Sequence, residues 1–502
     1  MGWRDEKLFS TEHLTRDLKG RSVRGGVVSM ANQGLKLAFQ LVQLTVLARL
    51  LTPEDYGIWG MALVVTGFLA LFQDLGLSMA TVQKREITRE QVSALFWVNA
   101  ALGAGIGLAA CALAPAVAWW NDAPELVPVI LAMGSAFLLN GLAVQHMALL
   151  RRQMRFGRIA LLELAALVGG TAVGIGCAWA GLAYWSLVWM QVANALFTAA
   201  GAWILCPWVP GRPRRAAIGS MIGFGAHLLG SNVLNYLGRS VDILLIGWRW
   251  GQEAVGFLER TMRVMQRPLT QVNAPVTHVA IPALSRVADQ PERYRAAYLR
   301  FVDKVLLVTL PGVALLVATS DWVVAVLMGP QWDEAAEIFA ILGLGALVQP
   351  LVHTFGWLFI SQGRTREMLH LGLVDTVARV AAVAIGLPWG ARGVAVGVTA
   401  RVLLLVPVYL WATGRRGPVS VRHLLQPMGA PFAAAAAVFA VVLSVRGATD
   451  FASPAAALAV TVPLAALAAL GVLALLPASR AALLDLYRSV QSLRRRKPAS
   501  AV

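Results

Sequence analysis

Apolar runs of about 18 or more residues recur along almost the whole chain, from residue 27 to residue 477. Each run is long enough to cross a hydrocarbon core about 30 Å thick as a helix. The composition agrees, since 58% of the 502 residues are hydrophobic and 14% are charged. Soluble domains average about 45–50% and about 25%. The sequence therefore predicts an all-α, polytopic integral membrane protein.

The polar connections divide the chain into about fourteen predicted transmembrane helices. They occupy residues 27–50, 58–83, 91–120, 125–150, 159–180, 182–206, 218–248, 254–285, 300–328, 335–361, 368–388, 390–413, 427–446 and 455–477.

Lysine and arginine concentrate in alternate connections. One set of connections, counted with both chain ends, holds 32 of them, whereas the other set holds only Arg249, Arg392 and Arg446. Because basic connections stay in the cytoplasm, both tails, residues 1–25 and 478–502, are predicted to be cytoplasmic. The net charge of +17 then reflects orientation and contact with anionic membrane lipids. No soluble segment is long enough for a nucleic-acid-binding domain.

Several functional classes lack their sequence signature. No G-x-x-x-x-G-K-[ST] loop is present for a nucleotide. The glycine runs "GAGIG" (103–107) and "GGTAVGIG" (169–176) lie inside spans, where they favour close helix contacts. The three cysteines and seven histidines are scattered, so neither a metal site nor a disulfide frame is predicted. We expect a transporter without a cofactor, not an enzyme.

The chain contains an internal repeat. The segments "DYGIWG" and "AVGFLE" align at an offset of 199 positions, which places Gly57 opposite Gly256. A weaker similarity links the fifth and eleventh spans, where Trp179 precedes "AGLAYW" and Trp389 precedes "GARGVAV". Polar residues of the first and seventh spans match at the offset of 199: Asn32, Lys36, Gln40 and Gln43 correspond to Ser231, Asn235, Arg239 and Asp242. An even number of spans separates equivalent positions, so the repeat is parallel, about an axis normal to the membrane.

The repeat predicts two six-helix lobes around a central cavity. Residues 26–207 form the N-lobe, 208–217 a cytoplasmic linker and 218–414 the C-lobe. The last two helices lie within residues 427–477.

The matched polar residues lie along one face of each helix. A charge facing lipid costs about 2.5–3.5 kcal/mol, so Lys36 and Arg239 should face protein or water. If the stripes held only asparagine and glutamine, hydrogen bonds that join neighbouring helices would be enough to explain them. Two matching stripes that carry charges favour a water-filled cavity.

The eighth span adds a cationic face. "GFLERTMRVMQR" places Arg260, Arg263 and Arg267 on one side of a helix. Glu259 stands one turn before Arg263 and is predicted to pair with it. Arg260 is shallow enough to reach the outer surface, whereas Arg267 lies deeper.

Other charged residues also lie inside spans. Asp375 and Arg379 stand one turn apart and favour a self-neutralising pair, while Arg401 has no partner nearby in sequence. Asp74 lies at a depth similar to that of Lys36, so these two are predicted to face each other or the same cavity. Both a buried ion pair that fixes helix packing and a proton- or ion-responsive switch fit this arrangement.

A family resemblance rests on residues 47–103, "LARLLTPEDYGIWGMALVVTGFLALFQDLGLSMATVQKREITREQVSALFWVNAALG". This stretch, followed by "VGFLERTMRV" and "IPALSRV" (281–287), resembles polysaccharide-repeat-unit flippases. These belong to the multidrug/oligosaccharidyl-lipid/polysaccharide exporter superfamily. The branch is similar to that of colanic-acid and teichuronic-acid exporters. Asp74 is then the acidic residue of the signature.

The resemblance implies a fourteen-helix, two-lobe transporter of the bacterial inner membrane that works by alternating access. The implied substrate is an undecaprenyl-pyrophosphate-linked oligosaccharide, flipped to the outer leaflet for exopolysaccharide or lipopolysaccharide synthesis. Other export and polymerase proteins would be its partners. The membrane potential suffices to draw the pyrophosphate outward, and coupling to H⁺ or Na⁺ is compatible but not required.

Specific roles follow for the polar residues. We expect the basic residues to hold the pyrophosphate, because Arg and Lys donate charge-assisted hydrogen bonds to phosphate. These are Lys36, Arg239, Arg263 and Arg267. Sugar contacts are assigned to Gln40, Gln43 and Asn235, and coupling to Asp74 and Asp242.

Four alternatives stay open. A lipid-II flippase is chemically close and is separated only by genetic context or complementation. A multidrug antiporter of the same superfamily would prefer acidic and aromatic walls for cationic drugs. A membrane-embedded polymerase or ligase would carry a large outer loop, and no outer connection here exceeds about a dozen residues. A purely structural membrane protein would not need duplicated polar stripes.

Overall fold

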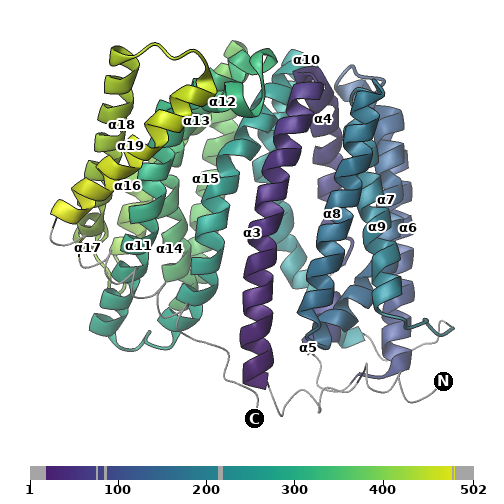
Figure 1. Ribbon diagram of the computed structural model, residues 1–502. Helices are drawn as coiled ribbons and strands as arrows, with labels where there is room; N and C mark the ends of the chain where they lie inside the picture. Colours follow the sequence, from purple (N-terminus) through teal and green to yellow (C-terminus); the bar gives the residue numbers. More distant parts are fainter. Residues whose placement is uncertain are drawn as a thin grey trace, which may run out of the picture. The chain divides into compact units, whose positions relative to one another are not determined.

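The computed structural model describes residues 9, 18–74, 77–83, 87–212, 219–476 and 480. For residues 18–30 and 219–235, and for single positions that include Arg239, it describes the backbone only. The described residues are helical almost throughout and contain no strand, as the sequence predicts (Figure 1).

The chain divides into two compact units, Met1–Gly256 and Phe257–Val502. The helices of the first unit, with the helix α10 that crosses the boundary, are α3 (Leu18–Leu50), α4 (Pro53–Ala70), α5 (Leu77–Gln83), α6 (Arg89–Trp120), α7 (Leu126–Arg152), α8 (Phe156–Trp179), α9 (Trp185–Leu205) and α10 (Gly219–Ser285). Helix α10 is two helices joined at Gly251, whose φ of 77° and ψ of −164° are open only to glycine.

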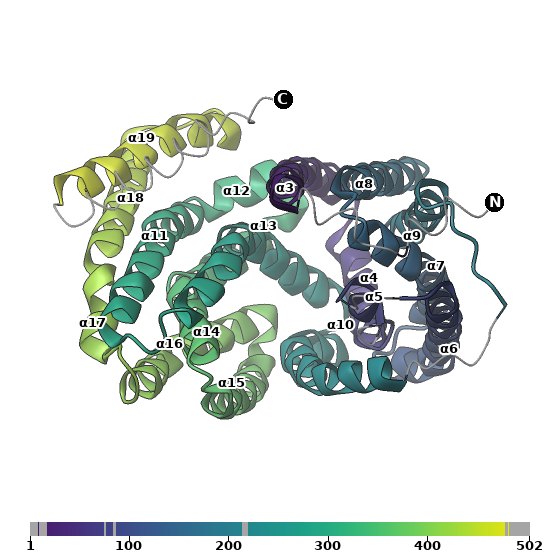
Figure 2. The same cartoon turned by 90° about the horizontal axis from the view of Figure 1, so that it is seen from below.

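The second unit continues after α10. Its helices are α11 (Pro291–Ala318), α12 (Ser320–Leu327), α13 (Asp333–Ala346), α14 (Gln349–Ser361), α15 (Thr365–Gly386), α16 (Gly390–Gly414), α17 (Val421–Leu425), α18 (Gly429–Ala448) and α19 (Pro454–Leu475). Short 3₁₀ turns at Pro330–Trp332, Leu387–Trp389 and Gln426–Met428 precede α13, α16 and α18. Within this unit, α18 packs against α11 and α19 (Figure 2).

Within the described residues, eight helices are long and apolar enough to cross a membrane, or nine if the bent pair Pro330–Ala346 and Gln349–Ser361 counts as one span. The protein is therefore a multi-pass membrane protein. Each of the fourteen predicted spans overlaps one helix or two successive helices in the described part of the chain, and the spans 58–83, 300–328 and 335–361 each hold two helices. The number of crossings stays a prediction.

Polar side chains start several of these helices where the apolar runs begin. At the start of α4, the Thr52 hydroxyl accepts from the backbone N–H of Asp55, and the Asp55 carboxylate accepts from the backbone N–H of Thr52. Thr88 and Gln91 make the same reciprocal pair before α6. These capping boxes satisfy backbone donors that have no partner inside the helix.

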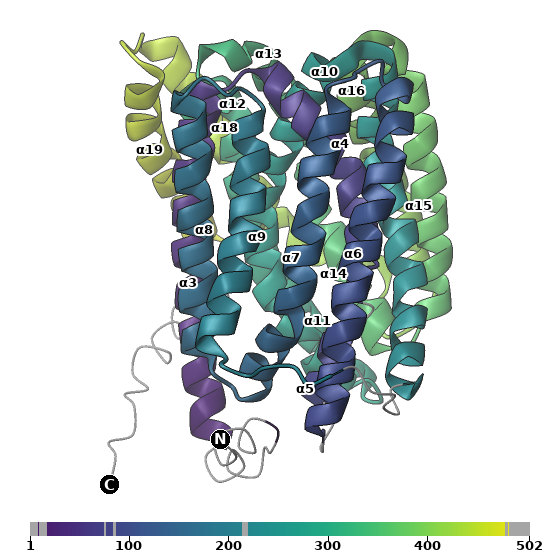
Figure 3. The ribbon, with the colours of Figure 1, turned by 90° about the vertical axis from the view of Figure 1, so that its right-hand side faces the viewer.

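Glycines let helices of the first unit pack closely. A Cβ on Gly107 of α6 would lie 3.0 Å from the carbonyl oxygen of Gly134 on α7. Gly170 and Gly174 of α8 likewise face the α9 backbone, because Cβ atoms there would lie 2.9 Å from Met190 O and 3.2 Å from Ser186 O. The prediction that these glycine runs serve helix contact is confirmed. Figure 3 shows α6, α7, α9 and α8 side by side.

Local backbone features also repeat between the two units, at an offset that is larger than the 199 positions found near Gly57. Left-handed residues occur at matched turns of the two units, 207 to 209 positions apart: Asp122, Met154 and Gly181 in the first, and Gly329, Gly363 and Gly390 in the second. Hydrogen bonds repeat as well, since the bond from Arg155 N to Leu150 O corresponds to that from Arg364 N to Phe359 O. The internal repeat is thus visible in local geometry. The arrangement of two lobes about a central cavity stays a prediction.

Candidate functional site

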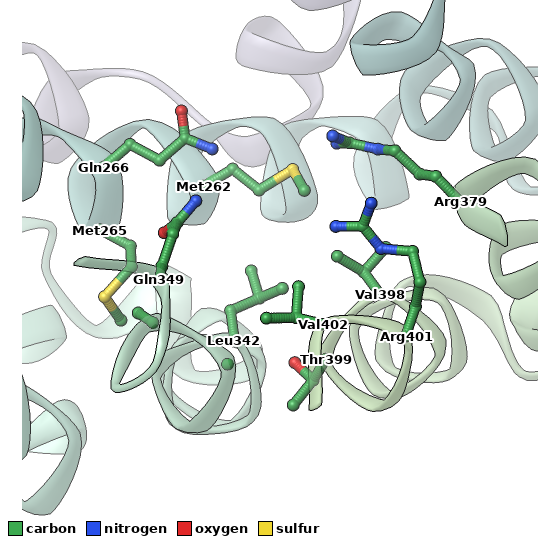
Figure 4. Close-up of a pocket in the computed structure, with 12 residues that line it drawn as sticks. Met262, Met265, Gln266, Leu342, Gln349, Arg379, Val398, Thr399, Arg401 and Val402 are labelled. Carbon is green, nitrogen blue, oxygen red and sulfur yellow. The ribbon is translucent and has the colours of Figure 1, made fainter. Parts of the chain in front are cut away.

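A polar cavity opens inside the second unit, within its membrane-spanning helices (Figure 4). It is a small cavity of about 70 Å³ that is partly open to the surroundings. Its polar lining residues are Gln266 of α10, Gln349 of α14, Arg379 of α15, and Thr399 and Arg401 of α16. In Figure 4 both guanidinium groups lie at one end of the cavity and both glutamines at the other.

A broken helix forms one wall. Helices α13 and α14 bend by 41° at Leu347–Val348, and residues on both sides of this break line the cavity. The start of α14 carries no side-chain cap. Discontinuous helices of this kind are typical of transporter binding sites, because irregular backbone is tolerated only where it lines a cavity.

Arg401 is the most enclosed charged residue in the cavity wall. Its side chain is 9% exposed, and its Nη1 lies 2.7 Å from Oδ1 of Asp375 on α15. Its Nε is buried and has no hydrogen-bond partner in the described part of the chain. A buried donor without a partner is rare in folded proteins and marks Arg401 as a candidate functional residue.

The structure therefore revises the sequence-based view of these charges. Asp375 forms an ion pair across helices with Arg401, which the sequence left without a partner, and its predicted pairing with Arg379 stays a prediction. Arg379 lines the same cavity. Sequence reasoning did not rank Arg379 and Arg401 as site residues. The available signal was that neither arginine, deep in an apolar span, can face lipid.

The predicted cationic face of α10 is present in part. Glu259 pairs with Arg263 one turn away, as predicted. Arg267 is half-buried and follows Gln266 in the sequence. Gln266 lines the cavity, but Arg263 and Arg267 are not among its lining residues. Arg260 is 5% exposed.

A second polar cluster lies in the first unit, where α3 packs along α8 (Figure 2). The Lys36 ammonium forms an ion pair with Oε2 of Glu163 on α8. The Asn32 amide donates to the same oxygen at 3.2 Å. The Lys36 and Glu163 side chains remain 19% and 30% exposed, so a polar ligand has access to them. Glu163 was not singled out from the sequence.

Lys36 and Asp74 therefore do not pair directly, and the prediction that they face the same cavity stays a prediction. The predicted span 58–83 is interrupted, since α4 ends at Ala70 and α5 begins at Leu77. Asp74 lies in this interruption, where its carboxylate accepts from the backbone N–H of Ser78 at 2.9 Å and from the Ser78 hydroxyl. Because both bonds stay within the local chain, Asp74 holds the first turn of α5.

We expect the Asp74→Asn variant to export polysaccharide within about twofold of wild type, because asparagine caps helix starts as well as aspartate does. Asp74→Ala is expected to weaken the start of α5 by about 1 kcal/mol and to lower the amount of folded protein. Export and membrane protein level, measured from pH 6 to pH 8, test both. Loss of export by Asp74→Asn at normal protein level would restore the switch interpretation.

The remaining predicted site residues are placed as follows. Gln40 is half-buried on α3, and Gln43 donates from Nε2 to the Met190 sulfur at 2.9 Å. Asp242 is fully buried on α10. The side chains of Asn235 and Arg239 lie outside the described residues. Across the described chain, no group of three or more His, Cys, Asp or Glu residues is placed to hold a metal ion.

Solved structures share this fold. The chain superimposes with a TM-score of 0.69 on the lipid II flippase MurJ in an inward closed conformation, at 10% identity, over 90% of this chain and 98% of that one. An inward-facing multidrug resistance transporter of the MATE family, in the MOP superfamily, gives a TM-score of 0.62 at 15% identity. That match covers 77% of this chain and 94% of the transporter. At these identities the likeness concerns the fold alone.

Sequence relatives are more specific. The chain is 23% identical to the lipopolysaccharide biosynthesis protein WzxC of Escherichia coli K12, over 77% of this chain and 79% of WzxC. It is 26% identical to the teichuronic acid biosynthesis protein TuaB of Bacillus subtilis 168, with 65% and 68% covered. The succinoglycan biosynthesis transport protein ExoT of Rhizobium meliloti 1021 is also 26% identical, with 73% and 74% covered.

The family resemblance predicted from the sequence is confirmed by the family profile as well. The profile of the family described as "Polysaccharide biosynthesis protein" matches residues 46–337, more than half of the chain. This protein belongs to the polysaccharide biosynthesis protein family.

Proposed function

We propose that this protein is a lipid-linked oligosaccharide flippase. It moves undecaprenyl-pyrophosphate-linked repeat units from the inner to the outer leaflet by alternating access, for exopolysaccharide or lipopolysaccharide synthesis. Family membership and relatives named for polysaccharide synthesis and transport support this proposal. It is a transporter, not an enzyme, and sits in the bacterial inner membrane with both termini in the cytoplasm.

The basic cavity is the observation that carries the proposal. Arg379 and Arg401 line the cavity with guanidinium groups, whose forked geometry matches phosphate oxygens. Gln266, Gln349 and Thr399 offer the amides and hydroxyl that bind sugar hydroxyls. A multidrug antiporter that binds cations would gain nothing from this wall.

Further substrate contacts are proposed for the residues predicted from the sequence. We assign pyrophosphate contacts also to Lys36, Arg239, Arg263 and Arg267, and sugar contacts to Gln40, Gln43 and Asn235. Asp242, fully buried on α10, remains the proposed coupling residue. Two negative charges that move outward against an inside-negative potential gain about 2.3 kcal/mol each per 100 mV, so the potential alone can drive the step. Other export and polymerase proteins are the proposed partners.

Deletion of the gene tests the function. We expect undecaprenyl-linked repeat units to accumulate in the inner leaflet, where an added membrane-impermeant glycosidase reaches them only in inside-out vesicles. Re-expression of this chain should restore outer-leaflet exposure, while a cell depleted of its lipid II flippase should not be rescued. Rescue of that cell, with no effect on the repeat unit, would favour the lipid II alternative.

A further inference from the structure

Helix α4 and the part of α10 that follows Gly251 touch through two glycines. A Cβ placed on Gly57 would overlap the carbonyl oxygen of Gln252 and lie 2.9 Å from its Cα. A Cβ placed on Gly256 would overlap the carbonyl oxygen of Pro53 and lie 3.2 Å from the backbone nitrogen of Gly57. Both glycines are buried and belong to the first compact unit. The two backbones therefore meet where no side chain fits.

The contact has the symmetry of the sequence repeat. At the offset of 199 positions, Gly57 corresponds to Gly256 and Pro53 corresponds to Gln252. The contact of Gly57 with Gln252 is thus the repeat equivalent of the contact of Gly256 with Pro53. This reciprocity is that of an isologous contact on a two-fold axis.

A tyrosine of α10 also packs against the α4 backbone. Further along α4, the Tyr236 hydroxyl of α10 lies 3.1 Å from Leu63 O and 3.0 Å from Val64 O. The same hydroxyl occupies the space where a Cβ of Gly67 would be. The kink at Gly251 lies just before the contact in the sequence, and glycine at this position allows α10 to change direction.

We propose that the Gly57–Gly256 contact is the seal that closes the transport pathway on the side opposite the basic connections, and that it opens once in each transport cycle. An alternating-access transporter must separate its repeats on one side while they stay closed on the other. A backbone contact held by packing and weak Cα–H···O bonds separates without breaking an ion pair. This inference rests on transport by alternating access and not on the identity of the substrate.

The test measures access to the seal directly. In the full-length protein, with Cys111, Cys177 and Cys206 replaced by alanine, Ile58→Cys places a thiol beside Gly57, where the native side chain is 4% exposed. A membrane-impermeant maleimide is added to whole cells whose outer membrane is permeabilised. We expect Gly57→Ala and Gly256→Ala each to raise the labelling rate about tenfold by shifting the closed–open equilibrium.

The controls separate the seal from general damage. Gly105→Ala changes a helical glycine of α6 whose Cβ would meet nothing within 4 Å, and it should leave labelling and export unchanged. The double variant Gly57→Ala/Gly256→Ala should label no faster than either single variant, because both break one contact. If the alanine variants fail to accumulate, Tyr236→Phe loosens the same interface without adding atoms and should also raise labelling.

Labelling at the wild-type rate in Gly57→Ala, Gly256→Ala and Tyr236→Phe would overturn the proposal. A rise in labelling without any effect of gene deletion on lipid-linked oligosaccharide would instead keep the seal and reject the proposed substrate. The two proposals therefore fail in distinguishable ways.

Discussion

Polysaccharide export is expected to fall about tenfold to a hundredfold when Arg401→Gln is combined with Asp375→Asn. The double variant removes one of the two guanidinium groups of the cavity and its ion-pair partner together. A hydrogen bond to a charged group contributes about 1.5–3 kcal/mol, and each 1.4 kcal/mol is a factor of ten. Export is measured as cell-surface polysaccharide per unit of membrane protein.

The double substitution separates binding from folding. Arg401→Gln alone leaves the partly buried Asp375 carboxylate without its partner Arg401, so the single variant is expected to lose protein as well as export. Asp375→Asn removes that stranded charge and should restore the protein level. If the double variant accumulates normally and exports normally, Arg401 serves only to hold α15 and α16 together.

A matched exposed pair provides the control. Arg392 lies 3.0 Å from Glu337, with both side chains more than half exposed. Exposed pairs contribute little to stability, so Arg392→Gln should change neither protein level nor export. Arg379→Gln, in contrast, should lower export on its own because Arg379 lines the same cavity.

The position of the helices is predictable from the sequence because hydropathy is a property of each local segment. Breaks within helices are not, because an apolar run continues across them. The span predicted at 58–83 holds two helices separated after Ala70, and that at 335–361 bends after Ala346. The bend creates a wall of the cavity, so the feature that shapes the candidate site lies beyond a hydropathy argument.

Charge pairing shows the same limit. The pair of Glu259 with Arg263 is predictable, since residues one turn apart on a helix must be neighbours. The partners of Lys36 and Arg401 lie 127 and 26 positions away and depend on which helices pack together. A single sequence shows that such charges need a partner, and only the packing shows which one.

Lys36→Gln is expected to lower export at least about tenfold, whereas Glu163→Gln should retain most of it. In the structure the Glu163 carboxylate is paired with the Lys36 ammonium group. We propose that the same ammonium group binds the pyrophosphate. A phosphate must displace this carboxylate before it binds Lys36. Loss of Glu163 leaves the ammonium available to phosphate, while loss of Lys36 removes the charge that attracts it.

The opposite pattern follows if the pair only joins α3 to α8. Both single variants would then impair export and protein level alike, because each leaves one partly buried charge alone, and Lys36→Gln/Glu163→Gln would recover both. Under phosphate binding, the double variant accumulates normally and exports as poorly as Lys36→Gln. Surface polysaccharide and membrane protein level are compared across the three variants. The double variant distinguishes the two interpretations, because it stays inactive only if transport requires the positive charge of Lys36.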